Sequence, residues 1–473
     1  MLVKFKTKDN RELVLSLLYD EQSREYHLLD NAANEYLSFK EDEETGYVFS
    51  KNDLLNESED SLFEKINLLL KQNSDDDLLG IEDDDSNEHN SDPFNPDDVS
   101  IETRTVTMET LLRRLEQKTI LLNPDFQRKE VWSIERKSQL IESLLLRIPL
   151  PMFYVSSDEK SNWTVVDGLQ RISTFRDYVL GSKYISDPTK YRKYKGEGFS
   201  LSDLEFWSDL NGKQMNDLPV NLYNRILETN FTFTIINPGT HEEVKRNIFK
   251  RLNTGGLPLS SQEIRNALYT GLSTELLNEL ATTKEFLAAT CRSIQAQRME
   301  DRELVLRYVA FILRDFSTYK RTQNIDTWLS DTMIILNSMP SLDSREINKC
   351  IKRGTVNAVD INRLTLDDIK NSFTIAMKRA KTIFGAHAFR KSVPGMRRRP
   401  VNKSLFETWG VILSSLSDSE FINLTKNRAQ LIREYTQILG REDFVIAISR
   451  DSMKHASVSL RFNLLKSLVQ KYK

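Results

Sequence analysis

The residues best suited to chemistry form a short loop, Asp167-Gly-Leu-Gln-Arg171, between a strand-like run, Trp163–Val166, and an amphipathic helical pattern, Ile172 to about Leu180. A strand that turns through glycine into a helix presents unpaired backbone N–H groups at the positive end of the helix dipole. Such a turn favours a bound phosphate. The spacing therefore predicts an anion site at the junction of strand and helix.

The side chains of this loop could each take part in such a site. Arg171, in the first helical turn, could hold phosphate oxygens through two parallel hydrogen bonds. Asp167 could hold a metal ion, orient a water molecule or accept a ribose hydroxyl, and Gln170 could position water or a base edge. The competing interpretation is a tight turn in which Asp167 caps the helix and Arg171 pairs with a nearby acid, since short motifs also match by chance.

Two further loops have the same polar character. Gln127 and Arg128 form a second Gln-Arg pair, and Arg251 and Asn253 precede a glycine pair, Gly255-Gly256. On the residues alone, the first loop is equally well explained by packed aromatic residues with polar neighbours at the surface. The second is equally well explained by an ordinary helix end, where basic residues complement the dipole.

A basic region toward the end of the chain is a candidate for DNA contact. Several of its cations together could neutralise phosphates and give strongly salt-dependent binding. A solvated basic loop is the competing interpretation. The candidate DNA-binding residues are Arg390, Lys391, Arg397, Arg398, Arg399 and Lys403.

The near-neutral total charge hides an asymmetry along the chain. Residues 1–100 carry nine Lys and Arg against 27 Asp and Glu, a net of −18, and residues 101–473 carry 57 against 42, a net of +15. This split points to polyanion binding by the basic part, although a merely basic folded body is the alternative. The steepest change falls in residues 74–100, where a run rich in Asp and Glu without Lys or Arg predicts a disordered linker.

The periodicity of the chain predicts four segments. Helix-capping residues stand at Thr107, Ser133 and Ser260, and the last 200 residues show almost only helical periodicity. The expected segments are a small α+β accessory domain at 1–73, an acidic linker at 74–100, a mixed α/β domain at 101–270 and a helical domain at 271–473.

Composition excludes several classes of protein. The two cysteines cannot form a disulfide framework, and the five histidines are too far apart for a His-x-x-x-His zinc helix. No run approaches the ~18 apolar residues of a membrane span, and no signal peptide is visible, so we expect a cytoplasmic protein without membrane contact. No set of metal ligands can be assigned.

The three loops, taken in order, resemble the N-terminal domain of GmrSD-type modification-dependent restriction enzymes, which belongs to the ParB/sulfiredoxin-like superfamily. The hallmark Asp-Gly-Gln-Gln-Arg of that family is similar to Asp167–Arg171, and a second hallmark is similar to Asn253–Arg265. The segments Pro124–Trp132, Glu303–Arg307 and Arg399–Glu407 are also similar to members. The fold class implied is α+β, with a ParB/sulfiredoxin-like mixed domain followed by a mostly helical region.

The resemblance implies a module that binds and hydrolyses an NTP, GTP or ATP with Mg²⁺, and senses double-stranded DNA, often modified phage DNA, in antiviral restriction. By matching positions, it implies a nucleotide site of Gln127, Arg128, Asp167, Gly168, Gln170, Arg171, Arg251 and Asn253, with Asp167, Gln170, Arg171 and Arg128 catalytic. One departure is Leu169, which replaces the first Gln of the hallmark; the change is harmless if its side chain points into the core.

Many relatives also carry a C-terminal His-Asn-His nuclease domain, which this sequence does not show. The favoured hypothesis is therefore an NTP-hydrolysing, DNA-sensing component of a restriction system that lacks its own nuclease. Two alternatives stay open: a non-enzymatic DNA- or nucleotide-binding regulator that scaffolds a separate nuclease subunit, and a ParB-like metal-dependent nuclease.

Overall fold

The structure is a computed structural model of the 473-residue chain. It describes residues 3–9, 11–20, 23, 25–42, 46–50, 55–58, 61–63, 65–66, 69–70, 81–82, 100–122, 132–158, 160–237, 260–294 and 298–473. Most of the expected linker, residues 74–100, lies outside these residues.

The chain divides into two compact units. One comprises Asn90–Leu268, and the other joins Met1–His89 with Tyr269–Lys473. The sequence places the mixed domain at 101–270, and the structure divides the chain at nearly the same residue on its C-terminal side.

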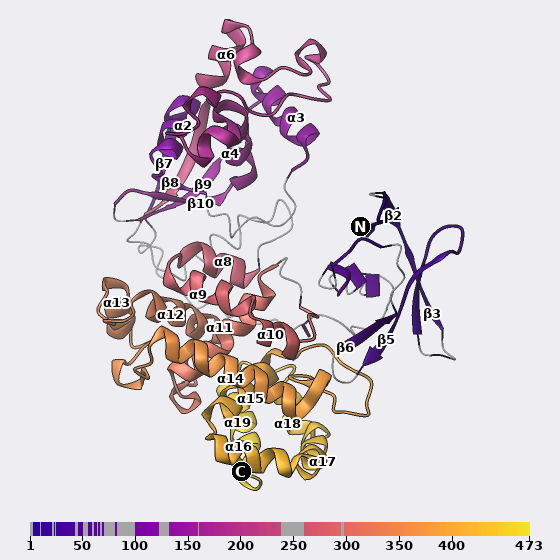
Figure 1. The fold of residues 1–473 in the computed structure, drawn as a ribbon. Helices are drawn as coiled ribbons and strands as arrows, with labels where there is room; N and C mark the ends of the chain where they lie inside the picture. The colour runs from indigo at the N-terminus through magenta and orange to yellow at the C-terminus, as the bar shows by residue number, and fades with distance from the viewer. Residues whose placement is uncertain are drawn as a thin grey trace. The chain divides into compact units, whose positions relative to one another are not determined.

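The Asn90–Leu268 unit is built on a mixed five-stranded sheet (Figure 1). The strand order is β7-β11-β9-β10-β8, with antiparallel pairs β7–β11 and β9–β10 and parallel pairs β11–β9 and β10–β8. The strands are β7 (Ile101–Thr107), β8 (Ile120–Leu121), β9 (Phe153–Ser157), β10 (Trp163–Asp167) and β11 (Asn230–Ile236). Because β9 and β10 run in opposite directions, the end of β10 lies at the same edge of the sheet as the starts of β9 and β11.

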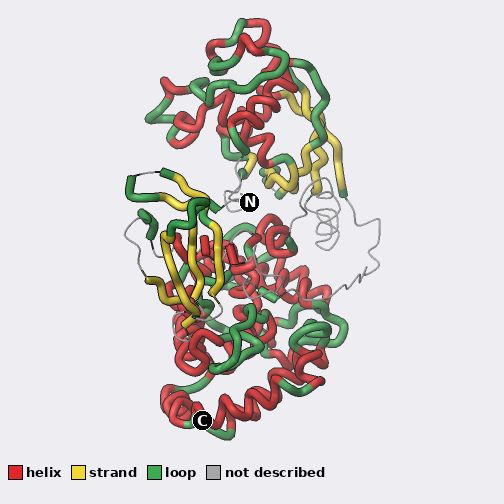
Figure 2. Tube along the Cα trace, turned by 90° about the vertical axis from the view of Figure 1, so that its right-hand side faces the viewer, coloured by secondary structure: helices red, strands yellow, loops and turns green. Residues whose placement is uncertain are grey.

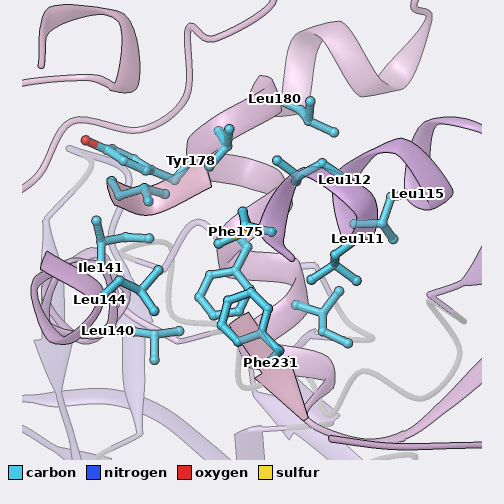
Figure 3. Packing of buried hydrophobic residues seen from close by; sticks show 14 of the residues in the cluster. Leu111, Leu112, Leu115, Leu140, Ile141, Leu144, Phe175, Tyr178, Leu180 and Phe231 are labelled. Atoms are coloured by element: carbon cyan, nitrogen blue, oxygen red, sulfur yellow. The ribbon is translucent and has the colours of Figure 1, made fainter. Parts of the chain in front are cut away.

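Helices cover one face of this sheet and form the main core. They are α2 (Met108–Glu116), α3 (Ile134–Leu145), α4 (Leu169–Phe175), α5 (Ser182–Ser186) and α6 (Val220–Leu227), with a π-helical turn η3 (Arg176–Gly181) after α4 and 3₁₀ turns η4 (Arg192–Tyr194), η5 (Ser208–Leu210) and η6 (Met215–Asp217). Figure 3 shows leucines of α2 and the Leu140–Leu144 stripe of α3 on either side of Phe175 and Phe231. These two rings stack at 5.1 Å between centroids.

The expected helix caps are confirmed. The side chain of Thr107 accepts a hydrogen bond from the backbone N–H of Thr110, and Ser133 accepts one from Arg136. Each satisfies a donor that the first helical turn leaves unpaired. The helix after the candidate loop begins at Leu169, three residues earlier than the periodicity indicates.

Buried polar side chains of α3 hold a long connection in place. Glu142 is 4% exposed, and its carboxylate accepts backbone N–H hydrogen bonds from Glu205, Phe206 and Trp207 at 3.2, 2.7 and 2.9 Å. Ser138 accepts a further one from Ser202 at 3.0 Å. A buried carboxylate is tolerated when its oxygens are satisfied in this way. The connection between α5 and α6 is thereby fixed to α3.

The other face of the sheet is covered by α8 (Ser261–Leu268). Ile264 and Ala267 of this helix form a small cluster with Ile236 of β11, and Val166 of β10 packs against it. Successive strand residues point to opposite faces. Since Phe233 and Ile235 lie in the main core, Ile236 marks the opposite face.

The first 89 residues contribute two small antiparallel sheets to their unit. A hairpin pairs Phe5 with Leu13, and a four-stranded sheet has the order β3-β4-β5-β6. The strands are β1 (Lys4–Lys6), β2 (Glu12–Val14), β3 (Ser16–Asp20), β4 (Glu25–Leu29), β5 (Glu35–Asp42) and β6 (Gly46–Ser50).

Residues 269–473 are helical, which confirms the expected fold class (Figure 2). The helices are α9 (Leu272–Ala281), α10 (Lys284–Ala289), α11 (Glu300–Leu313), α12 (Ile325–Asn337), α13 (Arg345–Arg353), α14 (Leu366–Phe384), α15 (Lys403–Ser415), α16 (Asp418–Lys426), α17 (Arg428–Leu439), α18 (Glu442–Ala447) and α19 (His455–Gln470), with 3₁₀ turns η9 (Phe316–Thr318), η10 (Ala358–Asp360) and η11 (Gly385–His387). None of the described helices combines the length and apolar character needed to cross a bilayer.

Candidate functional site

A β-bulge at the end of β10 determines where Asp167 points. Val165 pairs with Val155 of β9, but Asp167 pairs with Tyr154, so two residues of β10 oppose one of β9. Strict alternation would place Asp167 on the same face as Val165, in the main core. The bulge instead places it on the face of Tyr154, opposite to the core. Bulges are a common means of re-aiming a side chain next to a functional site.

The turn after Asp167 requires glycine. Gly168 is the N-cap of α4 and has a φ of 96°, in the left-handed region. A Cβ atom there would stand 2.3 Å from Cδ1 of Phe153. Leu169, the residue that departs from the family hallmark, is half-buried and packs against the main core. Its side chain serves packing, so the departure leaves the polar part of the loop intact.

Arg171 is engaged by the protein itself. Its Nη2 atom lies 3.0 Å from Oδ2 of Asp167, and its Nη1 atom donates to the carbonyl oxygen of Pro151. The guanidinium also lies over the ring of Phe153, 4.3 Å from the centroid. Burial lowers the pKa of Arg171, and Asp167 opposes that shift by stabilising the cation. An arginine remains protonated even so. The side chain therefore ties the Asp167 loop to the segment that enters β9.

Asp167 is more exposed to solvent than its partner Arg171. The side chain of Arg171 is 12% exposed and that of Asp167 is 38% exposed. Oδ2 of Asp167 faces the guanidinium, and Oδ1 accepts no hydrogen bond from any residue that the structure describes. The first backbone N–H groups of α4, from Leu169 to Arg171, have no carbonyl partner within the helix. An acceptor oxygen and a set of backbone donors thus stand side by side at the sheet edge.

The second motif lies on the same face of the sheet as Asp167. Ser260 and Glu263 form the predicted capping box at the start of α8, with Ser260 N–H donating to Glu263 at 2.6 Å and Glu263 N–H donating to Ser260 at 3.1 Å. The helix contacts β10 through Val166, the residue before Asp167. Two segments about 90 residues apart are thereby brought together.

Polar residues of α8 are buried on this face, and the sequence did not single them out as site residues. Gln262 and Arg265 are 0% and 3% exposed, and Arg265 Nη1 donates to Oε1 of Gln262 at 2.8 Å. Their alternation with Ile264 in a capped helix is typical of an exposed helical surface, so the sequence does not predict that they are buried.

A cavity of about 340 Å³ opens at the same edge of the sheet. It lies beside the segment that leads into β9, which is also the segment that Arg171 holds. Asp167 and Arg171 do not line it. Its lining residues are Leu144, Arg147, Ile148, Pro149, Leu150, Arg225, Glu228, Thr229, Asn230 and Phe231. Arg147 and Arg225 supply cations that the sequence did not point to, since they stand outside every recognisable motif.

Four of the expected nucleotide-site residues lie outside the described residues: Gln127, Arg128, Arg251 and Asn253. The structure places Asp167, Gly168, Gln170 and Arg171 together in one turn. Gln170 is half-buried, and its carbonyl oxygen accepts a hydrogen bond from Thr174 Oγ1 at 2.8 Å. Among the described residues, no three His, Cys, Asp or Glu side chains gather as a metal site would require.

The candidate DNA-binding residues have different surroundings from one another. Arg390 is fully buried and donates to the carbonyl oxygens of Ala386 and Thr290, so its side chain organises the fold. Arg398 is buried with its guanidinium 4.6 Å from the ring centroid of Tyr47.

The remaining members of that set divide into paired and exposed cations. Lys391 forms an ion pair with Glu82, and Lys403 lies 3.2 Å from Glu303. Arg397 and Arg399 are exposed. Of the six, only these last two are exposed.

Replacement of Gly168 by alanine should destabilise the Asn90–Leu268 unit. The positive φ alone costs roughly 1–3 kcal/mol for a residue with a Cβ atom, and the overlap with Phe153 adds to that cost. Gly212 is the matched control, because its φ is 83° and a Cβ atom there would meet nothing within 4 Å. The free energies of unfolding of both variants in urea separate the cost of the positive φ from the cost of the overlap with Phe153. Equal losses for Gly168→Ala and Gly212→Ala would contradict the close approach to Phe153.

Comparison with known proteins identifies this unit. Residues 108–270 match the family model described as GmrSD restriction endonuclease, N-terminal domain. A search of curated proteins gives no match. The matched segment spans both motifs of the site, the Asp167 loop and the start of α8. Residues 108–270, which include both motifs of the site, are therefore similar to the N-terminal domain of GmrSD restriction endonucleases.

Proposed function

We propose that this protein is the NTP-binding, NTP-hydrolysing and DNA-sensing component of a prokaryotic antiviral restriction system. The observation that carries the proposal is the β-bulge at Asp167, which turns a carboxylate out of the core and onto the face where the second family motif packs. One oxygen of this carboxylate pairs with Arg171, and the other, Oδ1, accepts no hydrogen bond from the described residues, which leaves it available to a ligand. The family match over 108–270 supports the same assignment.

The described residues fit a nucleotide in their chemistry. Backbone N–H groups at the start of α4 can donate to phosphate oxygens, and Oδ1 of Asp167 can accept from a ribose hydroxyl or from a water molecule on Mg²⁺. Bound Mg²⁺ would neutralise charge on the phosphates. The cavity beside Leu150 adds two arginines to the same sheet edge. Gln170 follows in the same turn, and its amide could orient water.

Arg171 acts in this proposal as a positioning residue. It connects Asp167 to the carbonyl oxygens of Pro151 and Met152, so it fixes the carboxylate relative to the sheet. Preorganised groups of this kind contribute to catalysis because they need no rearrangement when charge develops. Arg128 remains a proposed phosphate ligand on the family resemblance.

The same ion pair favours one alternative function. A guanidinium already neutralised by Asp167 suits a regulator that binds a nucleotide or DNA without turnover and acts on a separate nuclease subunit. This alternative differs from the main proposal in a single measurable property, which is phosphate release.

Phosphate release from GTP, ATP, CTP and UTP in the presence of Mg²⁺ tests the proposal directly. We expect turnover of at least one NTP by the purified chain, with a rate that changes when duplex DNA with and without modified bases is added. Asp167→Asn should abolish turnover while the chain remains folded. Nucleotide binding without release in every condition would reject hydrolysis and favour the regulator.

A further inference from the structure

A group of cations and aromatic rings lies on the surface of the Asn90–Leu268 unit, outside the site described above. We call this group the Lys–Tyr patch. The four cations are exposed and the two rings are half-buried. Its members are Lys183, Lys190, Tyr191, Arg192, Lys193 and Tyr194.

Local hydrogen bonds fold the patch into a compact turn between α5 and η4. Asp187 follows α5, and its carboxylate accepts backbone N–H hydrogen bonds from Thr189 at 3.1 Å and Lys190 at 3.0 Å. Its carbonyl oxygen accepts a third from Tyr191 at 2.9 Å. This turn brings Lys183 of α5 next to the rings that follow it, although eight or more residues separate them in sequence.

The two rings hold the lysine side chains in place without neutralising them. The Nζ atoms of Lys183 and Lys193 lie 3.6 and 4.9 Å from the ring centroid of Tyr194, and that of Lys190 lies 5.1 Å from Tyr191. A ring face attracts a cation but leaves its charge intact. Hydrogen bonding to Lys183, and then to Lys193, lowers the pKa of Tyr194, as expected beside concentrated positive charge.

None of the four cations forms an ion pair with a described residue. A neighbouring lysine shows the contrast: Lys195 Nζ lies 2.6 Å from Glu116 and is excluded from the patch for that reason. Surface lysines are commonly paired or isolated. Four cations stand within eleven residues. Three of them lie over tyrosine rings and none pairs with a described acid, so they form a local excess of positive charge that can attract a counter-charge.

We propose that the Lys–Tyr patch binds the phosphate backbone of duplex DNA, an inference that rests on the DNA-sensing part of the proposed function. A row of phosphates supplies the repeated negative charge that four adjacent cations match, and tyrosine hydroxyls donate to phosphate oxygens in many DNA complexes. A protein partner is a poorer fit, because the cores of protein interfaces are depleted in lysine. Contacts to the backbone position DNA and carry no sequence information themselves.

The test is a salt titration of duplex binding by the full chain. In the patch variant, Lys183, Lys190, Arg192 and Lys193 are replaced by Gln. The matched control replaces the four cations of α13, Arg345, Lys349, Lys352 and Arg353, by Gln, so both variants lose the same net charge. Fluorescence anisotropy of a labelled 20-base-pair duplex is followed from 50 to 200 mM salt.

We expect the patch variant alone to bind more weakly. Loss of four phosphate contacts should make the slope of log K against log salt shallower by about 3.6, equally for several sequences. Replacing Lys183, Lys190 and Lys193 by Arg should retain binding. Circular dichroism and thermal unfolding check that each variant folds.

Two results would overturn the inference, and they are distinguishable. If the parent chain binds duplex DNA and the patch variant keeps its affinity and salt slope, the patch is not the DNA surface and the proposed function stands. If the parent binds no DNA under any condition, DNA sensing fails together with the patch. A larger loss for duplex RNA than for DNA also rejects the partner proposed here.

Discussion

Arg171→Ala should lower NTP turnover by about 10²–10³-fold, the loss seen when one preorganised electrostatic group is removed from an active site. The reason lies in four contacts. Arg171 pairs with Asp167 at 3.0 Å, donates to the Pro151 carbonyl and to the Met152 carbonyl at 3.4 Å, and covers the ring of Phe153. Without it the Asp167 carboxylate loses its only described ion-pair partner. Displacement of a catalytic group by about 1 Å already costs roughly 10²-fold.

Arg176→Ala is the matched control for this change. Arg176 follows five residues later on the same helical segment and also pairs with a neighbouring aspartate, Asp177, through Nε at 2.9 Å and Nη2 at 2.6 Å. It contacts neither Asp167 nor the entry to β9. We therefore expect parental turnover from Arg176→Ala, provided that both variants unfold at the same urea concentration as the parent.

A double-mutant cycle decides how Arg171 acts. If it works through Asp167, the losses caused by Arg171→Ala and Asp167→Asn should not add, because both remove one arrangement. A positioning role also predicts that kcat falls with little change in KM and that Arg171→Lys recovers part of the rate. Additive losses with a raised KM would show that Arg171 binds the phosphates directly. Parental turnover in Arg171→Ala would reject the mechanism.

Local signals in the sequence were sufficient to place most elements of this unit. Thr107, Ser133 and Ser260 are each followed by an apolar stripe, and each forms the hydrogen bond that a helix start requires. Caps and periodicity depend on neighbours within four residues, so they can be read without the fold. The Asp167 loop was located for the same reason.

Long-range pairing could not be read in this way. Strand β7 was not predicted, because five of its seven residues are exposed and it lacks apolar alternation. It forms only because β11 offers it a seven-residue antiparallel register. The bulge at Asp167 is likewise invisible in the sequence, since it depends on how β10 pairs with β9. The face to which Asp167 points is therefore a property of the sheet.

The net charge of a segment likewise does not predict which of its cations are exposed. The net of +15 over residues 101–473 indicates a basic body but does not show which cations are free. Arg390 and Arg398 stand in one basic stretch and are buried, whereas the cations of the Lys–Tyr patch stand in another basic stretch and are exposed. Buried arginines satisfy carbonyl oxygens and carboxylates inside the fold, so local density of basic residues is a poor guide to surface potential.

Glu407→Ala should cost the helical region about 3–5 kcal/mol of stability, the largest structural effect we expect from one substitution. Glu407 on α15 is fully buried between two arginines that are each 1% exposed. Its Oε2 lies 3.3 Å from Nη1 of Arg307 on α11, and its Oε1 pairs with Arg461 on α19. Removal of this carboxylate would leave the buried Arg461 without its described ion-pair partner, and Arg307 would keep Glu303 as its described counter-charge.

The two family-like segments Glu303–Arg307 and Arg399–Glu407 meet in this cluster. Arg307 Nε also lies 3.2 Å from Glu303, which pairs in turn with Lys403. The arrangement explains both segments as a shared buried ion-pair network that connects three helices. These residues can therefore be required for the stability of the helical region without taking part in catalysis.

Urea unfolding followed by tryptophan fluorescence measures the effect, because Trp328 and Trp409 are buried in the helical region. Asp443→Ala is the matched control: it removes an acid that pairs with Arg441 at 2.7 Å, but these side chains are 47% and 48% exposed. An exposed pair contributes about 0–1 kcal/mol.

Glu407→Gln should also be destabilising, since it keeps the volume of the side chain but removes its charge. A loss for Glu407→Ala no larger than that for Asp443→Ala would mean that water or a rearranged acid compensates the two arginines, and that the cluster does not hold the three helices together.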